Sequence, residues 1–584
     1  MQDLEKLRHS LAHLLAAAVL ELYPDTKNTI GPAIDNGFYY DFEFSAPLGD
    51  DSLKEIEKKM KKLSNTWTSF EKKDVTADEA REFFKDNPYK LELIEEILSK
   101  GENITLYTSG KFTDLCRGGH IENMKDVSMD AFKLTRVAGA YWRGDEKNKM
   151  LTRIYGLAFA TAKELDAYEK QQEEARKRDH RKLGKELDLF IFSELIGPGL
   201  PVYTPKGATI RREIINYSNE LQMGIGYEEV HTPNINKAEL FKVSGHYEKY
   251  KEDMFLVVSN YSKEEYYLKP MNCPHHTQIY ASKMRSYRDL PVRIADFANL
   301  YRDEKPGELN GLTRLRAFAQ DDGHCFCRED QIKDEFVAVL GIVKRAMETY
   351  GMQYTIRLSL WDPKNPQNYL GEPKTWEKSQ KLLEEILVEN KIDYVRAEGE
   401  AAIYGPKMDL ISKDSLGREW QISTIQLDFI MPERFALKYT DSDGSEKTPV
   451  MIHRAIVGSP ERFLGILIEH YAGNFPLWLA PIQVKVIPVR TNHNEYAKDV
   501  FNLLKQNNIR ATLDDADENL GGKVRDAKNQ KMPYWIVIGD KEIESNTVTL
   551  ESRDLSAQAG SGNLGQISAE ELVSKLKEEI KNKK

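Results

Sequence analysis

The 584-residue sequence has few cysteines and no long apolar run. Four cysteines exclude the disulfide framework of a secreted scaffold, and they are typical of a protein in a reducing cytoplasm. The longest apolar runs, such as "LAHLLAAAVL" (11–20), fall short of the roughly 20 residues of a membrane-spanning helix. The charged start "MQDLEKLRHS" also lacks the apolar segment of a signal peptide. We therefore expect a cytoplasmic protein with no membrane partner.

The sequence also has no excess of basic residues. The 83 basic and 93 acidic side chains give a net charge of −10, which argues against indiscriminate coating of nucleic acid but allows a local basic surface for one RNA. A GxxxxGK[ST] loop is absent, so any nucleotide must be bound in another way.

The chain is too long for one hydrophobic core, and its composition is that of a globular protein. The charge-rich stretch 161–188 predicts a solvated helix between two domains. The last segment alternates strand and helix patterns, which predicts a parallel or mixed sheet with covering helices, and Ser568 with Glu571 predicts the start of a final helix. The predicted ranges are 1–160, a linker helix 161–186, 187–476 and 477–584.

His9 and His13 lie four residues apart near the N-terminus, and a helix would place them on one face, one turn apart. They could form a metal site, a catalytic pair or the polar edge of a core helix. An apolar stripe that includes Leu7, Leu11 and Leu14 favours the last reading for these residues alone.

The segment 299–326 concentrates arginines and carboxylates. Within it, "RLRAFAQDD" (314–322) has the alternation of a strand, which places alternate side chains on one face. Arginine neutralises phosphate oxygens and carboxylates hold Mg²⁺, so such a face suits a polyphosphate with magnesium. Arg462 lies at the start of an apolar helix pattern within 453–471 and adds another cation.

Several motifs carry a resemblance to a known family. "YRDE…RLRAF" resembles motif 2, "GSPERFLGILIEHY" motif 3 and "GYEEVHTPNI" (226–235) the dimer-interface motif 1 of class II aminoacyl-tRNA synthetases. "LKPMNCPHHTQIY", "RAFAQDDGHCF" and "PVMIHRAIVGSPERF" resemble the threonyl-tRNA synthetase family, and the likeness covers essentially the whole chain. It implies an α+β multidomain protein with an antiparallel-sheet catalytic core, an α+β editing domain and an α/β anticodon-binding domain.

The resemblance implies one Zn²⁺ per subunit, held by Cys273, His324 and His453, although no spacing rule joins these residues. In the family, the amino and hydroxyl groups of L-threonine fill the open zinc positions, so valine is rejected. Cys325 and Cys327 are expected to be structural, and His275 of "CPHH" is not expected to be a fourth ligand because it would block the substrate.

The resemblance also implies the residues that bind ATP, with Mg²⁺, and threonine. Arg302 is expected at the α-phosphate, Arg314 towards the β,γ-phosphates and Arg462 at the γ-phosphate. Glu304 is expected at the adenine end, with Phe318 stacked on the adenine ring. The expected floor and substrate contacts are Gln320, Asp322, Gln421 and Gln426, with Tyr404, Lys407 and Ser459 as weaker candidates.

Zinc cannot exclude serine, which also has a hydroxyl, so a second, hydrolytic site is expected. "RHSLAH" and "DLCRGGH" resemble the family's editing domain. The implied editing residues are His9, His13, Lys90, Asp114, Cys116 and His120. The two halves HxxxH and CxxxH have the spacing of a four-ligand zinc site, but we expect a metal-free pocket that uses water.

The C-terminal segment resembles an anticodon-binding domain, with Lys523, Arg525 and Glu542 as candidate contacts to tRNA(Thr). A homodimer through the catalytic domain is implied. The editing motif begins at residue 9, so the small ubiquitin-like domain with which many family members begin is not expected. Two alternatives remain: a catalytically idle relative that binds RNA or regulates, and a free-standing hydrolase of mischarged tRNA.

Overall fold

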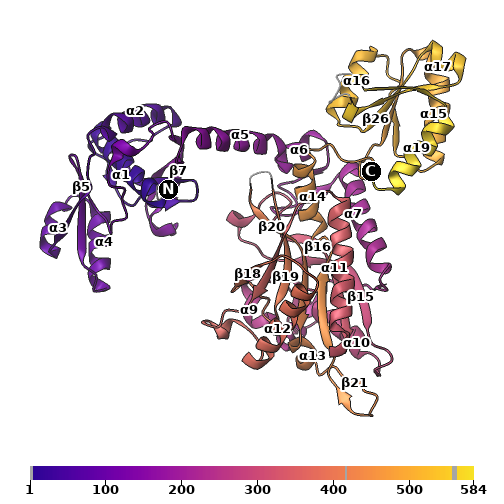
Figure 1. Cartoon of the computed structure of the whole chain (residues 1–584), viewed down its shortest axis with the longest axis horizontal. Coiled ribbons are helices and arrows are strands. Elements are labelled where there is room, and N and C mark those ends of the chain that lie inside the picture. Colours follow the sequence, from indigo (N-terminus) through magenta and orange to yellow (C-terminus); the bar gives the residue numbers. More distant parts are fainter. Residues whose placement is uncertain (1–3, 415–416, 556–561) are drawn as a thin grey trace. The chain divides into compact units, whose positions relative to one another are not determined.

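The computed structural model describes residues 4–414, 417–555 and 562–584 (Figure 1). It divides into two compact units, Met1–Glu173 and Glu174–Lys584, which are described separately. Within the described ranges, none of the helices has the length and apolar composition that a bilayer crossing demands.

The first unit is built on the N-terminal helix α1 (Leu4–Leu22), which packs with α2 (Leu53–Ser64) against an antiparallel sheet of order β1-β3-β8-β7, with β2 paired to β3. The predicted apolar stripe of α1 is buried in this core. The strands of this sheet are β1 (Lys27–Asn28), β2 (Ala33–Ile34), β3 (Gly37–Glu43), β7 (Phe132–Tyr141) and β8 (Met150–Ala158). A smaller part contains α3 (Ala77–Phe83), α4 (Pro88–Ser99), β4 (Glu71–Val75), β5 (Ile104–Ser109) and β6 (Phe112–Leu115).

The segment predicted as one helix over 161–188 is two helices, α5 (Ala162–Arg178) and α6 (His180–Glu186). The continuous helix was therefore wrong at Asp179. Its side chain accepts a hydrogen bond from the Arg181 backbone N–H at 2.8 Å and so caps α6. An N-cap residue leaves the helical conformation, which ends the preceding helix there.

An eight-stranded sheet forms the centre of the second unit, in the order β11-β15-β16-β23-β20-β19-β17-β18. The pairs β11–β15 and β17–β18 at its two edges are parallel, and the pairs between them are antiparallel. Its strands are β11 (Glu228–Glu229), β15 (Val292–Tyr301), β16 (Ala317–Cys327), β17 (Thr355–Leu360), β18 (Val395–Glu398), β19 (Lys407–Lys413), β20 (Glu419–Asp428) and β23 (Val450–Ala455).

Helices of the second unit contact this sheet, and some of them share with it the largest hydrophobic core among the described residues. They are α10 (Cys273–Ala281), α11 (Ile332–Thr349), α12 (Pro373–Glu389), α13 (Ile430–Arg434) and α14 (Pro460–His470), and α7 (Pro205–Met223) packs on α11 and α14. The shorter elements are β9 (Phe190–Ile191), β10 (Val202–Tyr203), β12 (Ile235–Lys237), α8 (Ala238–Ser244), α9 (His246–Tyr250), β13 (Leu256–Val257), β14 (Tyr266–Leu268), β21 (Tyr439–Thr440) and β22 (Glu446–Lys447).

The strand predicted from "RLRAFAQDD" begins later than its alternation suggested. β16 starts at Ala317, paired with Tyr301, so Arg314 and Arg316 lie in the loop before it. The Arg316 N–H donates to the Gly199 carbonyl at 2.9 Å instead of continuing the ladder. The alternation is therefore realised only from Ala317 onwards.

The C-terminal part has the mixed sheet that the sequence predicted, in the order β25-β24-β26-β27-β28. The pairs β25–β24 and β24–β26 are parallel, and the pairs β26–β27 and β27–β28 are antiparallel. Its elements are β24 (Val484–Pro488), α15 (Asn494–Gln506), β25 (Ala511–Leu513), α16 (Leu520–Asn529), β26 (Tyr534–Ile538), α17 (Asp540–Ser545), β27 (Val548–Ser552), β28 (Asn563–Ile567) and α19 (Ala569–Lys581). Ser568 and Glu571 form a capping box at α19, which confirms the predicted start of this helix.

Candidate active sites

A cavity of about 340 Å³ lies on the central sheet of the second unit. It brings together side chains from the loop before β16, from β16, β20 and β23, and from the start of α14. All nine residues expected at ATP and threonine line it: Arg302, Glu304, Arg314, Phe318, Gln320, Asp322, Gln421, Gln426 and Arg462. The weaker candidates Tyr404, Lys407 and Ser459 line it as well.

Strand register explains how distant residues meet in this cavity. Phe318, Gln320, Asp322 and His324 alternate along β16, so they share one face of the sheet. His324 is the direct partner of His453 on β23, and His453 is in turn the partner of Gln426 on β20. Residues more than a hundred positions apart in the sequence, such as His324 and His453, are thus neighbours on adjacent strands.

Cys273, His324 and His453 form a buried group whose potential ligand atoms lie within 4.8 Å of one another. The Nε2 of His324 is 3.0 Å from the Nδ1 of His453. Cys273 is the first residue of α10, which contacts β16. One thiolate and two imidazoles are a ligand set that suits a catalytic zinc with open positions.

The outer nitrogens of the two histidines are held by groups that the sequence reasoning did not single out. Asp428 Oδ2 lies 2.8 Å from His453 Nε2, and His276 Nδ1 lies 2.7 Å from His324 Nδ1. Such partners fix the tautomer and orientation of a metal-binding imidazole. His275, in contrast, lies 2.5 Å from Asn236 Oδ1 through its Nε2 and is outside the Cys273–His324–His453 group.

Two arginines of the cavity, Arg302 and Arg462, are buried with their positive charge only partly compensated. Burial, together with the neighbouring charges of Arg302 and Arg314, lowers the pKa of Arg462 to about 10. Burial also lowers the pKa of Arg302, whose guanidinium lies 5.2 Å from the centre of the Phe318 ring. Two buried arginines whose charge is disfavoured in this way favour binding of a polyanion.

Glu304 and Arg314 were expected at different ends of ATP, but in this structure they pair. Arg314 donates from Nε to Glu304 Oε2 at 2.8 Å and from a terminal nitrogen to Glu308 Oε2 at 2.9 Å.

Five of the six predicted editing residues, all except His120, line a second pocket in the first unit, about 360 Å³ in volume. His9, His13, Cys116 and His120 bring one potential ligand atom each within 4.8 Å of the others. Cys116 Sγ lies 3.3 Å from His120 Nε2 and 3.5 Å from His9 Nε2. The two histidines of α1 therefore lie together with Cys116 and His120, and "CRGGH" is not helical but irregular backbone with positive φ at Gly118 and Gly119.

Lys90 and Asp114 form a buried ion pair beside these residues, with Nζ and Oδ1 2.6 Å apart. The Tyr40 hydroxyl completes the cluster, because it donates to Asp114 Oδ2 at 2.5 Å and accepts from Lys90 Nζ at 3.3 Å. Sequence reasoning missed Tyr40. Its position within "GFYYDFEF" predicted a strand but gave no sign of which face of β3 met the pocket.

Burial favours the neutral forms of the histidines and of the Cys116 thiol in and beside the second pocket. It lowers the pKa of His120 to about 2, helped by His13 and His9, and it raises the pKa of the Cys116 thiol to about 11. The pKa of His13 is also well below its usual value because of burial. Neutral imidazoles can accept a proton from water.

The side chains of the three candidate anticodon-binding residues differ in their exposure and in their hydrogen bonds. The Lys523 side chain is buried, and its Nζ donates to the carbonyls of Asp514 at 2.9 Å and Pro488 at 3.2 Å. Glu542 accepts from Thr549 at 2.6 Å and from the Gly539 backbone N–H at 2.9 Å. Arg525 is exposed on α16. The environment of Lys523 is that of a residue that joins loops within the domain.

Family models match three parts of the chain. The model described as "tRNA synthetase class II core domain (G, H, P, S and T)" matches residues 255–471, and "Anticodon binding domain" matches 483–579. "Threonyl and Alanyl tRNA synthetase second additional domain" matches 104–155. A threonine–tRNA ligase of Staphylococcus carnosus is 47% identical over 585 residues, which cover 100% of this chain and 89% of that protein. The chain belongs to the threonine–tRNA ligase family.

Other members of the threonine–tRNA ligase family show the same extent of likeness. The enzyme of Deinococcus radiodurans is 48% identical over 99% of this chain and 89% of its own. Among solved structures, the RNA-binding domain of threonyl-tRNA synthetase from Cryptosporidium parvum has a TM-score of 0.64 and 36% identity, covering 68% of this chain and 98% of that one. A threonyl-tRNA synthetase from Aeropyrum pernix has a TM-score of 0.61 and 30% identity, covering 69% and 97%. The predicted fold class and family are confirmed.

Proposed function

We propose that this threonine–tRNA ligase family member joins L-threonine to tRNA(Thr) through threonyl-adenylate, and that its first unit hydrolyses Ser-tRNA(Thr). The observation that carries the proposal is the convergence of the nine expected residues on one cavity, which Cys273 and His453 of the Cys273–His324–His453 group also line. This geometry argues against a catalytically idle relative, which would have lost part of this set.

Adenylate formation needs the threonine carboxylate to attack the α-phosphorus of ATP while pyrophosphate leaves. In this proposal Arg302 neutralises the α-phosphate, and Arg314 and Arg462 neutralise the β- and γ-phosphates, with Mg²⁺ bound to ATP. Phe318 stacks on adenine, and Glu304 binds its edge. Positioning and charge neutralisation lower the barrier without a covalent enzyme intermediate.

The floor of the cavity suits the substrate's ammonium group. Asp322 Oδ2 is buried and has no hydrogen-bond partner among the described residues, and Gln426 accepts from the Tyr404 hydroxyl at 2.7 Å. A buried acceptor of this kind favours a donor from a ligand. We assign Asp322, Gln320, Gln421 and Gln426 to threonine and the adenylate.

Cys273, His324 and His453 are assigned to one Zn²⁺, since their metal-facing atoms converge while Asp428 and His276 hold the outer nitrogens. When bound, zinc supplies coordination positions for the amino and hydroxyl groups of threonine, which valine cannot fill. Asp428 orients His453, and His276 orients His324.

In the editing pocket, we propose that neutral His13 or His9, with no metal, takes a proton from the water that attacks the carbonyl carbon of the seryl ester. The bond to the ribose oxygen of the tRNA then breaks, and the histidine returns the proton to that oxygen, which releases serine and tRNA(Thr). Lys90, paired with Asp114, donates to the developing charge. Discrimination against serine by one methyl group in the first site is worth only about 1–3 kcal/mol, so a hydrolytic step is needed.

The proposed partner is tRNA(Thr), with Arg525 and Glu542 on the anticodon side and Lys523 supporting the loop between β25 and α16. We further propose a homodimer through the catalytic domain. Exposed apolar side chains at the end of β9 and in the segment that follows it support this: Ile191, Phe192, Leu195 and Ile196. The cytoplasmic location remains a prediction.

Threonine-dependent exchange of pyrophosphate into ATP tests the first activity. We expect exchange with threonine and much less with valine. Exchange with other amino acids but not threonine would disprove the substrate. For editing, His13→Ala should leave threonylation near the wild-type rate and let Ser-tRNA(Thr) accumulate, while His231→Ala, an exposed histidine, serves as the matched control.

Zinc content provides a separate test of the metal assignment. Cys273→Ser should lower bound zinc from about one per subunit to well below it and abolish exchange. Cys327→Ser, at a buried cysteine outside the group, should keep the zinc. Zinc retained by Cys273→Ser would refute the assignment.

A further inference from the structure

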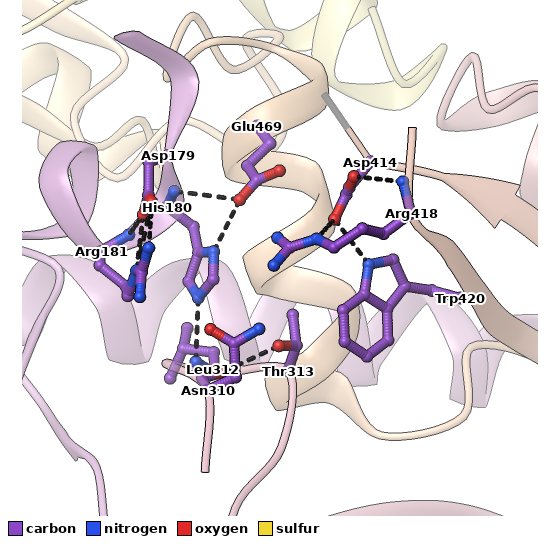
Figure 2. A network of polar contacts seen from close by, with 10 residues as sticks. All are labelled: Asp179, His180, Arg181, Asn310, Leu312, Thr313, Asp414, Arg418, Trp420 and Glu469. Atoms are coloured by element: carbon purple, nitrogen blue, oxygen red, sulfur yellow. Dashed lines mark hydrogen bonds and ion pairs between the residues drawn. The ribbon is translucent and has the colours of Figure 1, made fainter. Parts of the chain in front are cut away.

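His180, the first residue of α6, is buried against the loop that joins β15 to β16, here called the motif 2 loop (302–316). Its Nε2 accepts from the Leu312 backbone N–H at 3.0 Å, and its Nδ1 lies 2.7 Å from Glu469 Oε1 on α14 (Figure 2). An imidazole that accepts at Nε2 carries its proton on Nδ1, so Glu469 fixes the required tautomer. The loop is thus tied to α14 through one side chain.

The backbone around His180 fits the ring closely. Gly311 has φ +48°, and a Cβ there would lie 2.1 Å from His180 Nε2. On the opposite side, a Cβ on Gly465 of α14 would lie 3.5 Å from His180 Cδ2 and 3.3 Å from Leu312 Cβ. The ring therefore lies between the motif 2 loop and α14.

The next loop residue holds the arginine assigned to the γ-phosphate. The Thr313 carbonyl accepts from Arg462 Nε at 2.9 Å. Arg462 and Glu469 are both on α14, seven positions apart, so α14 contacts residues 312–313 at two points. The Arg462 guanidinium also lies 5.6 Å from the centre of the Trp420 ring, and Trp420 donates to Asp414 at 2.8 Å.

We propose that His180 is a positioning residue for adenylate formation, which fixes residues 312–313 so that the Thr313 carbonyl orients Arg462 towards the ATP polyphosphate. The inference rests on the proposed role of Arg462. His180 itself does not line the cavity. Asp179, His180 and Glu469 also meet the geometric conditions of a metal group, but both ring nitrogens of His180 are engaged in hydrogen bonds, so a bound metal is not proposed.

The test measures the Kd for ATP by calorimetry on the full chain. His180→Ala should raise it about tenfold, as expected when a hydrogen bond that positions a charged group is lost. The KM for threonine, the zinc content and the hydrolysis of Ser-tRNA(Thr) should stay unchanged. His180→Gln, whose amide oxygen can accept from Leu312, should recover most of the affinity. Lys182→Ala, an exposed position of the same helix, is the control.

A double-mutant cycle tests the role of His180 separately from the proposed role of Arg462. If His180 acts through Arg462, His180→Ala should have no further effect on the ATP Kd when Arg462 is already alanine. Additive effects, an equal loss of threonine affinity, or a failure of His180→Gln to recover ATP binding would overturn the role of His180. An unchanged ATP Kd in Arg462→Ala alone would instead overturn the proposed role of Arg462.

Discussion

Cys116 offers a test of the editing pocket at the scale of one residue. Because burial raises its thiol pKa to about 11, against about 8.5 for a free cysteine, we expect only about one thiolate in a thousand at pH 8. Alkylation by iodoacetamide should therefore be slow and should rise about tenfold per pH unit between roughly pH 8 and 10. Peptide mass spectrometry measures the rate.

The other three cysteines are buried, so labelling of the native protein reports Cys116, and Cys116→Ser is the control. A raised thiol pKa means less thiolate at every pH below it, and therefore slower alkylation. A rate that levels off near pH 8.5, as in an unfolded chain, would contradict the buried environment of this thiol.

Site residues could be predicted from the sequence where they belong to a recognisable motif. The residues that contact them in the folded protein could not be predicted. Cys273, His324 and His453 follow from the resemblance, and the register of β16 with β23 brings the two histidines together. Tyr40 was missed because a strand pattern does not show what lies opposite its face. Lys523 was chosen for its charge, but its ammonium serves two backbone carbonyls, a placement that only the folded loops determine.

At the scale of elements, the start of α19 gives a sharp prediction. Ser568 accepts from the Glu571 backbone N–H at 3.1 Å, and Glu571 accepts in return from the Ser568 N–H at 3.0 Å. Ser568→Ala removes one half of this capping box and should destabilise the helix by about 1 kcal/mol. Faster hydrogen exchange at the first turn of α19 measures the loss.

Ser574→Ala is the matched control, because Ser574 lies within α19 and its hydroxyl only bonds the Glu570 carbonyl one turn back. Exchange at the first turn should be unaffected by this change. Equal protection in Ser568→Ala and the wild type would show that packing, and not the cap, sets the stability of this end.

Elements were predictable where local chemistry and tertiary structure agree. Capping at Ser568 is a local signal, and the structure confirms it. The helix break at Asp179 could not be predicted from the sequence, because the surrounding residues are strong helix formers. The N-cap residue is also only one charged residue among many in this stretch. The late start of β16 was hidden because a bond to the distant Gly199 ends the ladder.

At the scale of the whole molecule, the order of the parts was predictable because each carries its own motifs, whereas an interface between copies depends on what the folded surface exposes. Leu195 is 99% exposed, with Ile191, Phe192 and Ile196 between 43% and 53% exposed in the same segment. Large apolar side chains gathered in this way are typical of an interaction surface. The segment begins at the last residue of β9 and ends before β10.

Leu195→Asp should therefore weaken association of the catalytic domains, because it places a charge where an apolar contact is expected. We expect the Kd of the dimer to rise at least about tenfold, the effect of losing one apolar anchor. Sedimentation velocity over a range of concentrations measures it. Met284→Asp, at a side chain that is 97% exposed elsewhere on the catalytic domain, controls for the added charge and should leave the dimer intact. If Leu195→Asp sediments like the wild type, or if the wild type is a monomer at every concentration, this segment is not the dimer interface.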